Sequence, residues 1–303
     1  MKSSLVSIVI PTYNRAGDLE RALKSVFAQT YSNWEVLIID NHSTDNTDDV
    51  VNNFKDSRVK LFKIHNLGMI AASRNLGIKY AEGEYIAFLD SDDWWTPRKL
   101  DESLKYLERG VDVIYHDLFT VTKTNQRFFW KKASTRGLKS PVFEDLIVRG
   151  NALNNSSVVI RKNFLLEIGP FPEDTIMNPI CDYAAWLHVA KHTENFRRIP
   201  KTLGYLWIGG GNVTTPERTI TSLDHFESFY ENDLKNLSQN ALWFHYAKGR
   251  AHYRLGSYEA AQKKLGLVLF QPVTFKLKAK SLYMILMGNV RLFFRSLKRK
   301  PYD

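Results

Sequence analysis

The chain has a single cysteine, Cys181, among its 303 residues, so an internal disulfide is excluded. One cysteine agrees with a reducing compartment. No run of 18 or more apolar residues occurs, which argues against a spanning helix. The apolar run 5–10 is too short for a signal-peptide core, and Pro11 ends it. We therefore expect a cytoplasmic protein, either soluble or peripheral on the inner face of the plasma membrane.

Acidic residues are scarce only at the C-terminal end. Residues 248–303 contain 13 Lys or Arg but only Glu259 and Asp303, so this segment carries a formal charge of +11 and the other 247 residues sum to −1. A basic patch can meet nucleic acid, anionic lipid or a phosphorylated substrate. No nucleic-acid-binding motif accompanies it, so we expect no nucleic-acid partner.

The first half alternates apolar runs with helical patterns. Such alternation predicts a mostly parallel sheet flanked by helices on both faces, an α/β fold. The predicted strands are 6–10, 35–39, 59–64, 85–89 and 111–116, and the predicted helices are 19–27, 45–54, 71–80 and 97–108. The segment 118–206 is less regular, with a strand expected at 156–160 and helices at 163–168 and 182–192.

Polar residues follow several of these strands directly. In parallel sheets, ligands bind beyond the carboxyl ends of the strands. We therefore expect the residues after separate strands to converge on one rim: Thr12, Asn14, Asp40, Asn41, Asp90, Asp92 and Asp93. Asp90-Ser91-Asp92-Asp93 is the strongest local feature, because its carboxylates repel one another unless a cation neutralises them. Hard oxygen ligands on a loop suit Mg²⁺ or Mn²⁺. The alternative is a solvated acidic turn before the helix at 97.

The first 115 or so residues resemble the family 2 glycosyltransferases, which have the GT-A fold. The resemblance is carried by SIVIPTYNRAGDLERALKSVFAQTYSNWEVLIIDNHSTDNT and AASRNLGIKYAEGEYIAFLDSDD. These five blocks occur in the family's order and at its usual intervals. The resemblance implies that Asp92 binds the metal, as a Lewis acid on the leaving nucleoside diphosphate. It also implies a nucleotide-sugar-binding set of Pro11, Thr12, Asn14, Asp40, Arg74, Asp90 and Ser91, in which Asp40 holds the base.

The resemblance also implies a catalytic carboxylate about 90 residues after the metal motif. The stretch IGPFPEDTIMNPICDYAAWLHVA places Asp182 at this position. As general base, Asp182 would take the proton from the acceptor hydroxyl during direct displacement, which predicts inversion. The alternatives are that Asp182 only caps its helix, or that Asp174 or Glu173 is the base.

The late part of the chain departs from the family pattern. Tyr205-Leu206-Trp207-Ile208 stands where members often carry a Tyr-Arg pair and then a histidine, so a late protein ligand to the metal or diphosphate is in doubt. The QxxRW cluster of processive polysaccharide synthases is absent, which favours transfer of a single sugar.

From residue 223 onward the pattern is helical. Gly249, Gly256, Tyr258, Ala261, Leu265 and Pro272 match the spacing of a tetratricopeptide-like hairpin, although an ordinary helix pair fits as well. The stretch 275–300 is a basic amphipathic helix that suits either an anionic membrane surface or packing on the protein body. One set of residues, apolar except for Asn289, recurs near helical spacing: Leu282, Ile285, Leu286, Asn289, Leu292, Phe293 and Leu297.

We predict a GT-A domain at 1–215, with a nucleotide-binding half at about 1–115 and an acceptor half at about 116–215, followed by a helical region at 216–303. The predicted function is metal-dependent, inverting transfer of a hexosyl or N-acetylhexosaminyl unit from a nucleotide-sugar, expected to be a UDP-sugar, to a lipid-linked or surface-glycan acceptor. One alternative function is a nucleotidyltransferase, which is disfavoured because the loop PTYNRAG after the first strand has one glycine and is not glycine-rich. The other alternative is a catalytically dead transferase domain that serves as a helical-hairpin adaptor. A dehydrogenase is disfavoured because no GxGxxG follows the first strand.

Overall fold

The computed structural model describes residues 4–123, 126, 128, 131–210, 214–237, 241–270 and 275–298, the last of these without the side chains of 276 and 295–298. The chain divides into two compact units. Unit 1 comprises Met1–Leu146 and Asn151–Gly211, and unit 2 comprises Ile147–Gly150 and Asn212–Asp303. The domain boundary expected at residue 215 stays a prediction.

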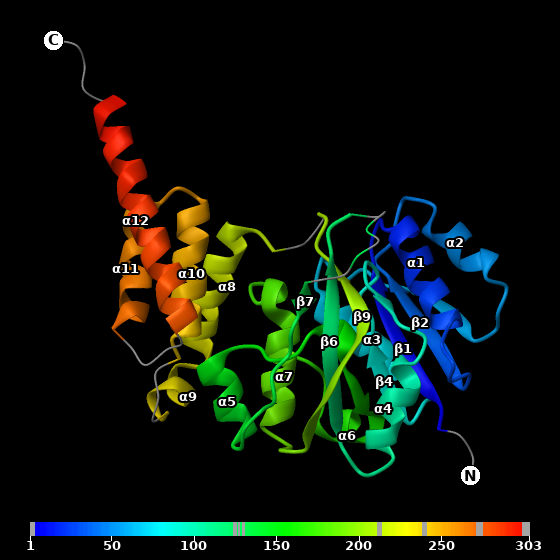
Figure 1. Cartoon of the computed structure of the whole chain (residues 1–303). Helices are drawn as coiled ribbons and strands as arrows, with labels where there is room; N and C mark the ends of the chain where they lie inside the picture. The colour runs from blue at the N-terminus through cyan, green and yellow to red at the C-terminus, as the bar shows by residue number, and fades with distance from the viewer. Residues whose placement is uncertain are drawn as a thin grey trace. The chain divides into compact units, whose positions relative to one another are not determined.

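The N-terminal half of unit 1 is a parallel α/β arrangement (Figure 1). The central strand β1 pairs in parallel with β2 on one side and β4 on the other, and β2 pairs with β3. The bounds are β1 Val6–Thr12, α1 Ala16–Phe27, β2 Trp34–Asp40, α2 Thr47–Asn53, β3 Val59–Lys63, α3 Ile70–Tyr80 and β4 Tyr85–Phe88.

Helices cover both faces of this half because both faces of β1 are apolar. Val6, Ile8 and Ile10 belong to the same core cluster as Leu19 and Leu23 of α1. On the other face, a Cβ at Gly77 of α3 would lie 2.4 Å from Val9 Cγ1, so only glycine allows this approach of helix to strand. The close packing of α3 fixes the side chains that this helix carries towards the strand ends.

The second half of unit 1 mixes strand directions. Within the described residues nine strands form one sheet, in the order β3-β2-β1-β4-β8-β6-β9-β5, with β7 paired to β6. Strand β8 is antiparallel to both β4 and β6, whereas β6 and β9 are parallel. The α/β GT-A prediction is confirmed, and the sheet is mixed in the half where the sequence was least regular. The bounds are β5 Trp94–Trp95, α4 Lys99–Leu107, β6 Val113–Val121, β7 Lys132–Ala133, α5 Val142–Arg149, η1 Asn155–Ser157, β8 Val159–Arg161, α6 Lys162–Ile168, η2 Asn178–Ile180, α7 Cys181–Ala190 and β9 Phe196–Trp207.

The long strand β9 is the largest element that the sequence pattern did not predict. It contains Pro200, which has no N–H to donate to a strand ladder. The pairing with β6 shifts at this point, from His116 opposite Ile199 to Asp117 opposite Thr202. The irregularity therefore accommodates the proline, and the strand continues to Trp207 beside the DSDD loop.

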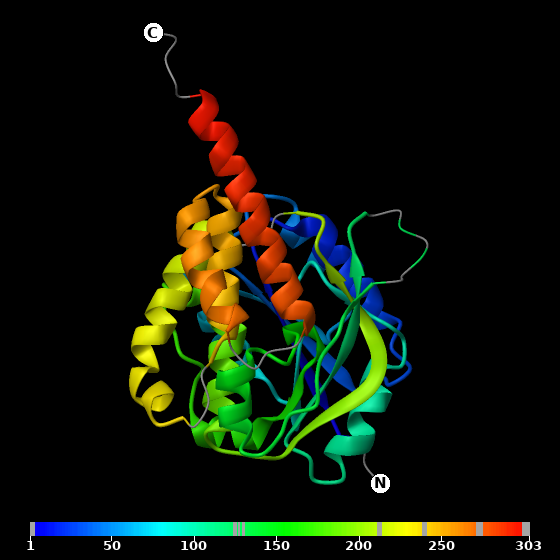
Figure 2. The same cartoon turned by 60° about the vertical axis from the view of Figure 1, so that its left-hand side comes forward.

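The described secondary structure of unit 2 from residue 214 onward is helical, with α8 Pro216–Phe229, α9 Glu231–Lys235, α10 Trp243–Arg254, α11 Tyr258–Leu269 and α12 Phe275–Lys298. Helices α10 and α11 form a hairpin, with Gly256 at φ +73° between them. A Cβ at Gly249 would lie 2.6 Å from Leu265 Cγ, so glycine sets their separation. Pro272 lies outside the described residues. Helix α12 packs alongside α11, and its C-terminal part extends past the ends of α10 and α11 (Figures 1 and 2).

None of the helices in the described part of the chain combines the length and the apolar character needed to cross a membrane.

Candidate active site

The carboxyl ends of β1, β2 and β4 bring most of the predicted rim residues together. Thr12 lies opposite Asp40 in the β1–β2 register, and the Asn41 amide donates to the Thr12 carbonyl at 3.0 Å. Pro11 precedes Thr12 in the same strand, opposite Ile39. Thr12 is 5% exposed, and its Oγ1 is buried without a hydrogen-bond partner among the described residues. This rim joins two loops, 13–15 and 41–46.

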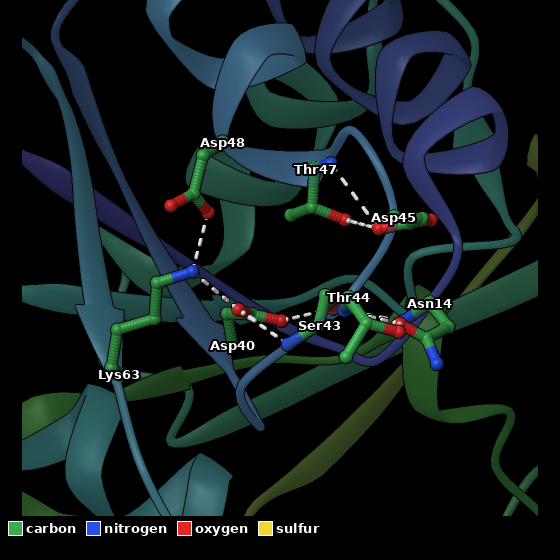
Figure 3. A network of polar contacts seen from close by, with 8 residues as sticks. All are labelled: Asn14, Asp40, Ser43, Thr44, Asp45, Thr47, Asp48 and Lys63. Carbon is green, nitrogen blue, oxygen red and sulfur yellow. Dashed lines mark hydrogen bonds and ion pairs between the residues drawn. The ribbon is translucent and has the colours of Figure 1, made fainter.

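A polar network ties these two loops together (Figure 3). The Thr44 amide donates to Asn14 Oδ1 at 2.7 Å, and the Asn14 amide donates to Ser43 Oγ at 2.8 Å. Asn14 has φ +50°, a left-handed conformation that asparagine tolerates better than most residues. Ser43 in turn donates to Asp40 through both its amide and its hydroxyl. Asn14 thus acts in this structure as the link between the first and second loops.

Asp40 is the innermost member of this network. Its side chain is 0% exposed, and Lys63 Nζ donates to its Oδ2 at 2.7 Å while also pairing with Asp48 (Figure 3). Both carboxylate oxygens therefore accept hydrogen bonds from the protein. In this conformation Asp40 fixes the loop that follows β2, and its predicted contact with the base stays a prediction.

Arg74 joins the loop after β4 to the start of α7. This arginine is 4% exposed, and it donates to Asp90 Oδ1 at 3.0 Å and to Cys181 Sγ at 3.3 Å. Burial alone would lower the pKa of Arg74, but Cys181, Asp90 and Asp182 raise it, so the guanidinium stays charged. Asn155 Nδ2 also donates to Asp90 Oδ1 at 2.8 Å. The Arg74 guanidinium therefore lies near both the predicted metal motif, through Asp90, and the predicted base Asp182.

The three carboxylates of DSDD point to different partners. Asp92 Oδ2 pairs with Arg15 at 2.9 Å. Asp93 is 1% exposed and accepts from the Trp207 amide at 2.8 Å and from Ser156 Oγ at 2.5 Å. Asp93 therefore anchors the loop to β9 and η1. Ser91 is also buried. The three carboxylates thus have separate protein partners, but besides burial the charge of Asp90 still raises the pKa of both Asp92 and Asp93.

Asp92 is the carboxylate with the character of a metal ligand. Burial, and next the charge of Asp90, raise its pKa to about 6, while Arg15 opposes this. A divalent cation between Asp90 and Asp92 would relieve the same repulsion. In the part of the chain that the structure describes, no cluster of three or more His, Cys, Asp or Glu side chains could hold a metal. One or two carboxylates completed by substrate phosphates is a common Mg²⁺ arrangement, so the residues present fit such an ion.

Asp182 lies in the first turn of α7, whose N-cap is Ile180. Its Oδ2 accepts a hydrogen bond from Asn151 Nδ2 at 3.1 Å. Burial raises the pKa of Asp182, and the nearby Arg74 opposes that rise. A carboxylate with a raised pKa is a better proton acceptor at neutral pH than an ordinary aspartate. Asp182 is therefore not the helix N-cap, and its role as general base stays a prediction.

The two alternative bases have other contacts. Glu173 Oε1 accepts from Asn75 Nδ2 at 2.8 Å, and Asp174 Oδ1 accepts from the amides of Ile176 and Met177. Both belong to the loop that leads into α7, and neither is bonded to Arg74 or Asn151.

Several side chains of this site escaped the sequence analysis. Arg15 was visible inside PTYNR, but nothing in the sequence links it to Asp92, 77 residues away. The others hold a predicted residue from a separate element: Lys63, Asn151, Asn155 and Ser156. In the stretch that lacks the family's arginine and histidine, the Trp207 ring centroid lies 5.4 Å from the Arg21 guanidinium carbon. Of the Gly-Asn-Val-Thr element at 211–214 that follows, residues 211–213 lie outside the described residues.

Comparisons with known proteins give the family of this chain. Residues 7–166 match the model of glycosyl transferase family 2. The chain is 42% identical over 116 residues to the Escherichia coli UDP-Glc:alpha-D-GlcNAc-diphosphoundecaprenol beta-1,3-glucosyltransferase WfgD, covering 38% of this chain and 46% of that protein. The chain spans less than half of the length of the first curated relatives it matches.

Solved structures share the fold at low sequence identity. S. aureus TarS 1–349, in complex with UDP-GlcNAc, superposes with a TM-score of 0.57 at 17% identity, over 99% of this chain and 93% of that one. The mannosyltransferase PcManGT from Pyrobaculum calidifontis, in complex with GDP-Man and Mn²⁺, gives 0.55 at 18% identity, over 95% and 80%. Because the family model matches more than half of the chain, this protein belongs to the family 2 glycosyltransferases.

Proposed function

We propose that this chain is a metal-dependent, inverting glycosyltransferase that moves one sugar from a UDP-sugar to a lipid-linked or surface-glycan acceptor. The observation that carries the proposal is the cluster around Arg74, which contacts Asp90 directly and interacts through its charge with Asp182. The donor would bind at the rim of β1, β2 and β4 with Mn²⁺ or Mg²⁺ at Asp92. Nucleotidyl transfer and a dead adaptor domain are not favoured, because the chain belongs to a glycosyltransferase family and keeps its carboxylates.

The reaction is a single displacement. Asp182 takes the proton from an acceptor hydroxyl, the hydroxyl oxygen forms a bond to C1 of the sugar, and the bond from C1 to the phosphate oxygen breaks. The nucleoside diphosphate leaves with the bonding electron pair, and the divalent ion supplies Lewis-acid stabilisation of its charge. Attack from the face opposite the leaving group inverts the anomeric centre.

The donor and acceptor classes rest on the relatives. UDP-GlcNAc is bound in the TarS complex, and the E. coli relative is named for UDP-Glc and a diphosphoundecaprenol-linked sugar. We therefore propose a hexosyl or N-acetylhexosaminyl donor carried on UDP and an acceptor carried on a lipid diphosphate, reached at the cytoplasmic face of a membrane.

The test is a panel of UDP- and GDP-sugars offered with a synthetic lipid-diphosphate-linked GlcNAc acceptor and Mn²⁺. We expect a mass increase of one sugar with a UDP donor, loss of product in chelator, and an inverted anomeric configuration by NMR. Product with retained configuration would contradict the mechanism, and nucleotide transfer to the acceptor would support the nucleotidyltransferase instead.

We further propose that α12 attaches the protein to an anionic membrane surface. The predicted apolar residues of this helix divide between two faces. Ile285 packs against the cluster of Ala261, Leu265 and Met284, while Leu282, Leu286 and Phe293 are exposed. Leu297 has no described side chain. We call the exposed apolar and aromatic side chains of this helix the apolar stripe: Phe275, Leu282, Tyr283, Leu286, Val290, Phe293 and Phe294.

The positive charge of the C-terminal segment favours an anionic membrane as the partner of this stripe. The segment 248–303 has a formal charge of +11, and each cation near an anionic bilayer contributes about 1 kcal/mol. The C-terminal part of α12, which carries Phe293 and Phe294, extends past its neighbouring helices (Figure 2). Aromatic side chains and cations on an exposed helix suit a lipid interface.

Vesicle flotation tests this attachment. We expect binding to anionic but not neutral vesicles, lost at high salt, after truncation following Met287, and in the double variant Phe293→Ser/Phe294→Ser. Leu166→Ser is the matched control, because Leu166 is 55% exposed on unit 1, outside the stripe. If the full-length chain ignores anionic vesicles at low salt, the membrane proposal fails.

A further inference from the structure

Two arginines of the first loop and helix hold Asp92. Arg15 Nη1 contacts Asp92 Oδ2 at 2.9 Å, and it lies 3.4 Å from Asp18 Oδ2. Arg21 Nη2 donates to the Asp92 carbonyl oxygen at 2.8 Å and to Asp18 Oδ1 at 2.8 Å. Arg15 thus contacts the carboxylate of Asp92, whereas Arg21 contacts its backbone.

Arg21 is fixed by further contacts. Its guanidinium carbon lies 4.4 Å from the centroid of the Trp94 ring, a cation–π distance. Arg15 is the N-cap residue of α1, but its side chain makes no capping hydrogen bond, so the helix does not depend on that side chain. Arg21 therefore has the surroundings of a structural residue, and Arg15 can be replaced without removing a cap.

The Arg15–Asp92 pair is only partly exposed. The Asp92 side chain is 19% exposed and the Arg15 side chain 21%. Ion pairs in such surroundings are screened less than those in open solvent. The guanidinium also opposes the effects of burial and of Asp90, which favour protonation of Asp92. Arg15 thus neutralises the carboxylate on which the donor's metal depends.

We propose that Arg15 is a positioning residue that occupies the place of the cation beside Asp92 until a divalent ion arrives with the nucleoside diphosphate. This inference rests on the proposed function. The metal competes with Arg15 for Asp92, so the ion alone binds weakly. The diphosphate supplies the additional oxygen ligands that the described residues do not provide. Arg15 then keeps Asp18 as its nearest acidic partner.

The consequence is a coupling between metal and nucleotide. A competing internal cation lowers the affinity of the metal-only state more than that of the ternary complex, because only in the ternary complex can the displaced guanidinium pair with the diphosphate. Linkage requires that UDP raise the affinity for metal by the same factor as metal raises the affinity for UDP. Arg15 should therefore make up part of this factor.

Mn²⁺ binding measured by electron paramagnetic resonance tests the proposal without activity. The wild type and Arg15→Gln are titrated with Mn²⁺ alone and with Mn²⁺ in saturating UDP. We expect Arg15→Gln to bind Mn²⁺ alone about tenfold more tightly, which corresponds to about 1.4 kcal/mol, and to show a correspondingly smaller enhancement by UDP. Arg15→Lys, which retains the charge, should resemble the wild type.

Arg21→Gln is the matched control, because Arg21 contacts the Asp92 backbone and leaves its carboxylate alone; its metal-only affinity should change little. Circular dichroism verifies that each variant is folded. If Arg15→Gln binds Mn²⁺ alone no more tightly than the wild type, the role of Arg15 is wrong. Asp92→Ala separates this failure from a failure of the proposed function: binding of Mn²⁺ with UDP that survives Asp92→Ala overturns the metal assignment itself.

Discussion

Charged side chains have partners of opposite charge at the strand-end rim, whereas those in the interior beneath α4 do not have them among the described residues. At the rim, Asp40 is paired with Lys63, Asp90 with Arg74, and Asp92 with Arg15, each from a different element. In the interior, Lys99 is 0% exposed, and its Nζ has no hydrogen-bond partner among the described residues. Its nearest aromatic ring is that of Trp95, 3.9 Å away.

His116 is the second uncompensated group of the interior. It is 0% exposed, and its Nε2 also has no partner among the described residues. The rim pairs each bring a group of opposite charge to the carboxylate, whereas Lys99 and His116 have none within hydrogen-bond distance among the described residues and burial drives them towards neutrality. We therefore expect that removing one member of a rim pair lowers the free energy of unfolding, because the other member is left without its partner. Removing an unpaired interior group should raise the free energy of unfolding, because the folded state no longer buries an unsatisfied polar group.

The largest effect is expected at the rim, in the proposed base. Asp182→Asn keeps the size and an acceptor oxygen but cannot take a proton, so transfer should fall by about 10²–10⁴. Binding of UDP with Mn²⁺ should be preserved. Glu173→Gln is the matched control and should transfer at a near-normal rate. Steady-state kinetics with calorimetry measures both quantities, and near-normal turnover of Asp182→Asn would move the base to Asp174 or Glu173.

The rim was predictable where chemistry follows strand ends. Asp40 and the DSDD run stand directly after apolar runs, so period and position located them without a structure. The partners were not predictable, because Arg15, Asn151 and Ser156 come from segments with no pattern that links them to a carboxylate. Strand β9 was missed because Pro200 and three cations interrupt its apolar alternation.

For the interior, neither the burial of Lys99 nor its lack of a hydrogen-bond partner among the described residues could be predicted from the sequence. A lysine at the start of a predicted helix reads as a solvated residue, since lysine is almost never fully buried without a partner. Only the tertiary packing of α4 on the sheet shows that Lys99 lies inside. A buried lysine without a partner is thus recognised only once the fold is known, and its effect on the free energy of unfolding can then be measured.

The second prediction breaks a rim pair. Burial alone would lower the pKa of Lys63, but Asp40 and Asp48 raise it, so the pair is ionic. Lys63→Met leaves the fully buried Asp40 without its cation. We expect a loss of roughly 2–3 kcal/mol in the free energy of unfolding, below the 3–5 kcal/mol of fully buried pairs because Lys63 is 32% exposed. Urea denaturation measures it. Asp48→Asn, which removes an exposed partner only, should change stability by less than about 0.5 kcal/mol.

The third prediction acts on the interior and has the opposite sign. Lys99→Met replaces an unpaired buried amine by an apolar side chain of similar length, and should raise the free energy of unfolding by about 1–3 kcal/mol. Burial lowers the pKa of Lys99 well below its usual value, so the unfolded chain binds a proton that the native state lacks. The gain should therefore be larger at pH 7 than at pH 10. A loss of stability at pH 7 would mean that Lys99 has a stabilising partner.

The smallest effect concerns the slope of stability against pH. Burial, and next the charge of Lys99, lower the pKa of His116 to about 3. The native imidazole is thus neutral down to that pH, whereas the unfolded imidazole takes a proton below about 6.5. The unfolded state binds more protons between these values, so stability falls as pH falls, by about 1.4 kcal/mol per unit from this group.

His116 Nδ1 lies 2.9 Å from the Asp117 carbonyl and can donate to it. His116→Asn retains a donor at that position and removes the titration. Urea midpoints from pH 6 to pH 4 should fall less steeply in His116→Asn than in the wild type, even where the substitution lowers stability at pH 7. Equal slopes would show that His116 takes up its proton without unfolding, and the interior beneath α4 would then tolerate a charge as the rim does.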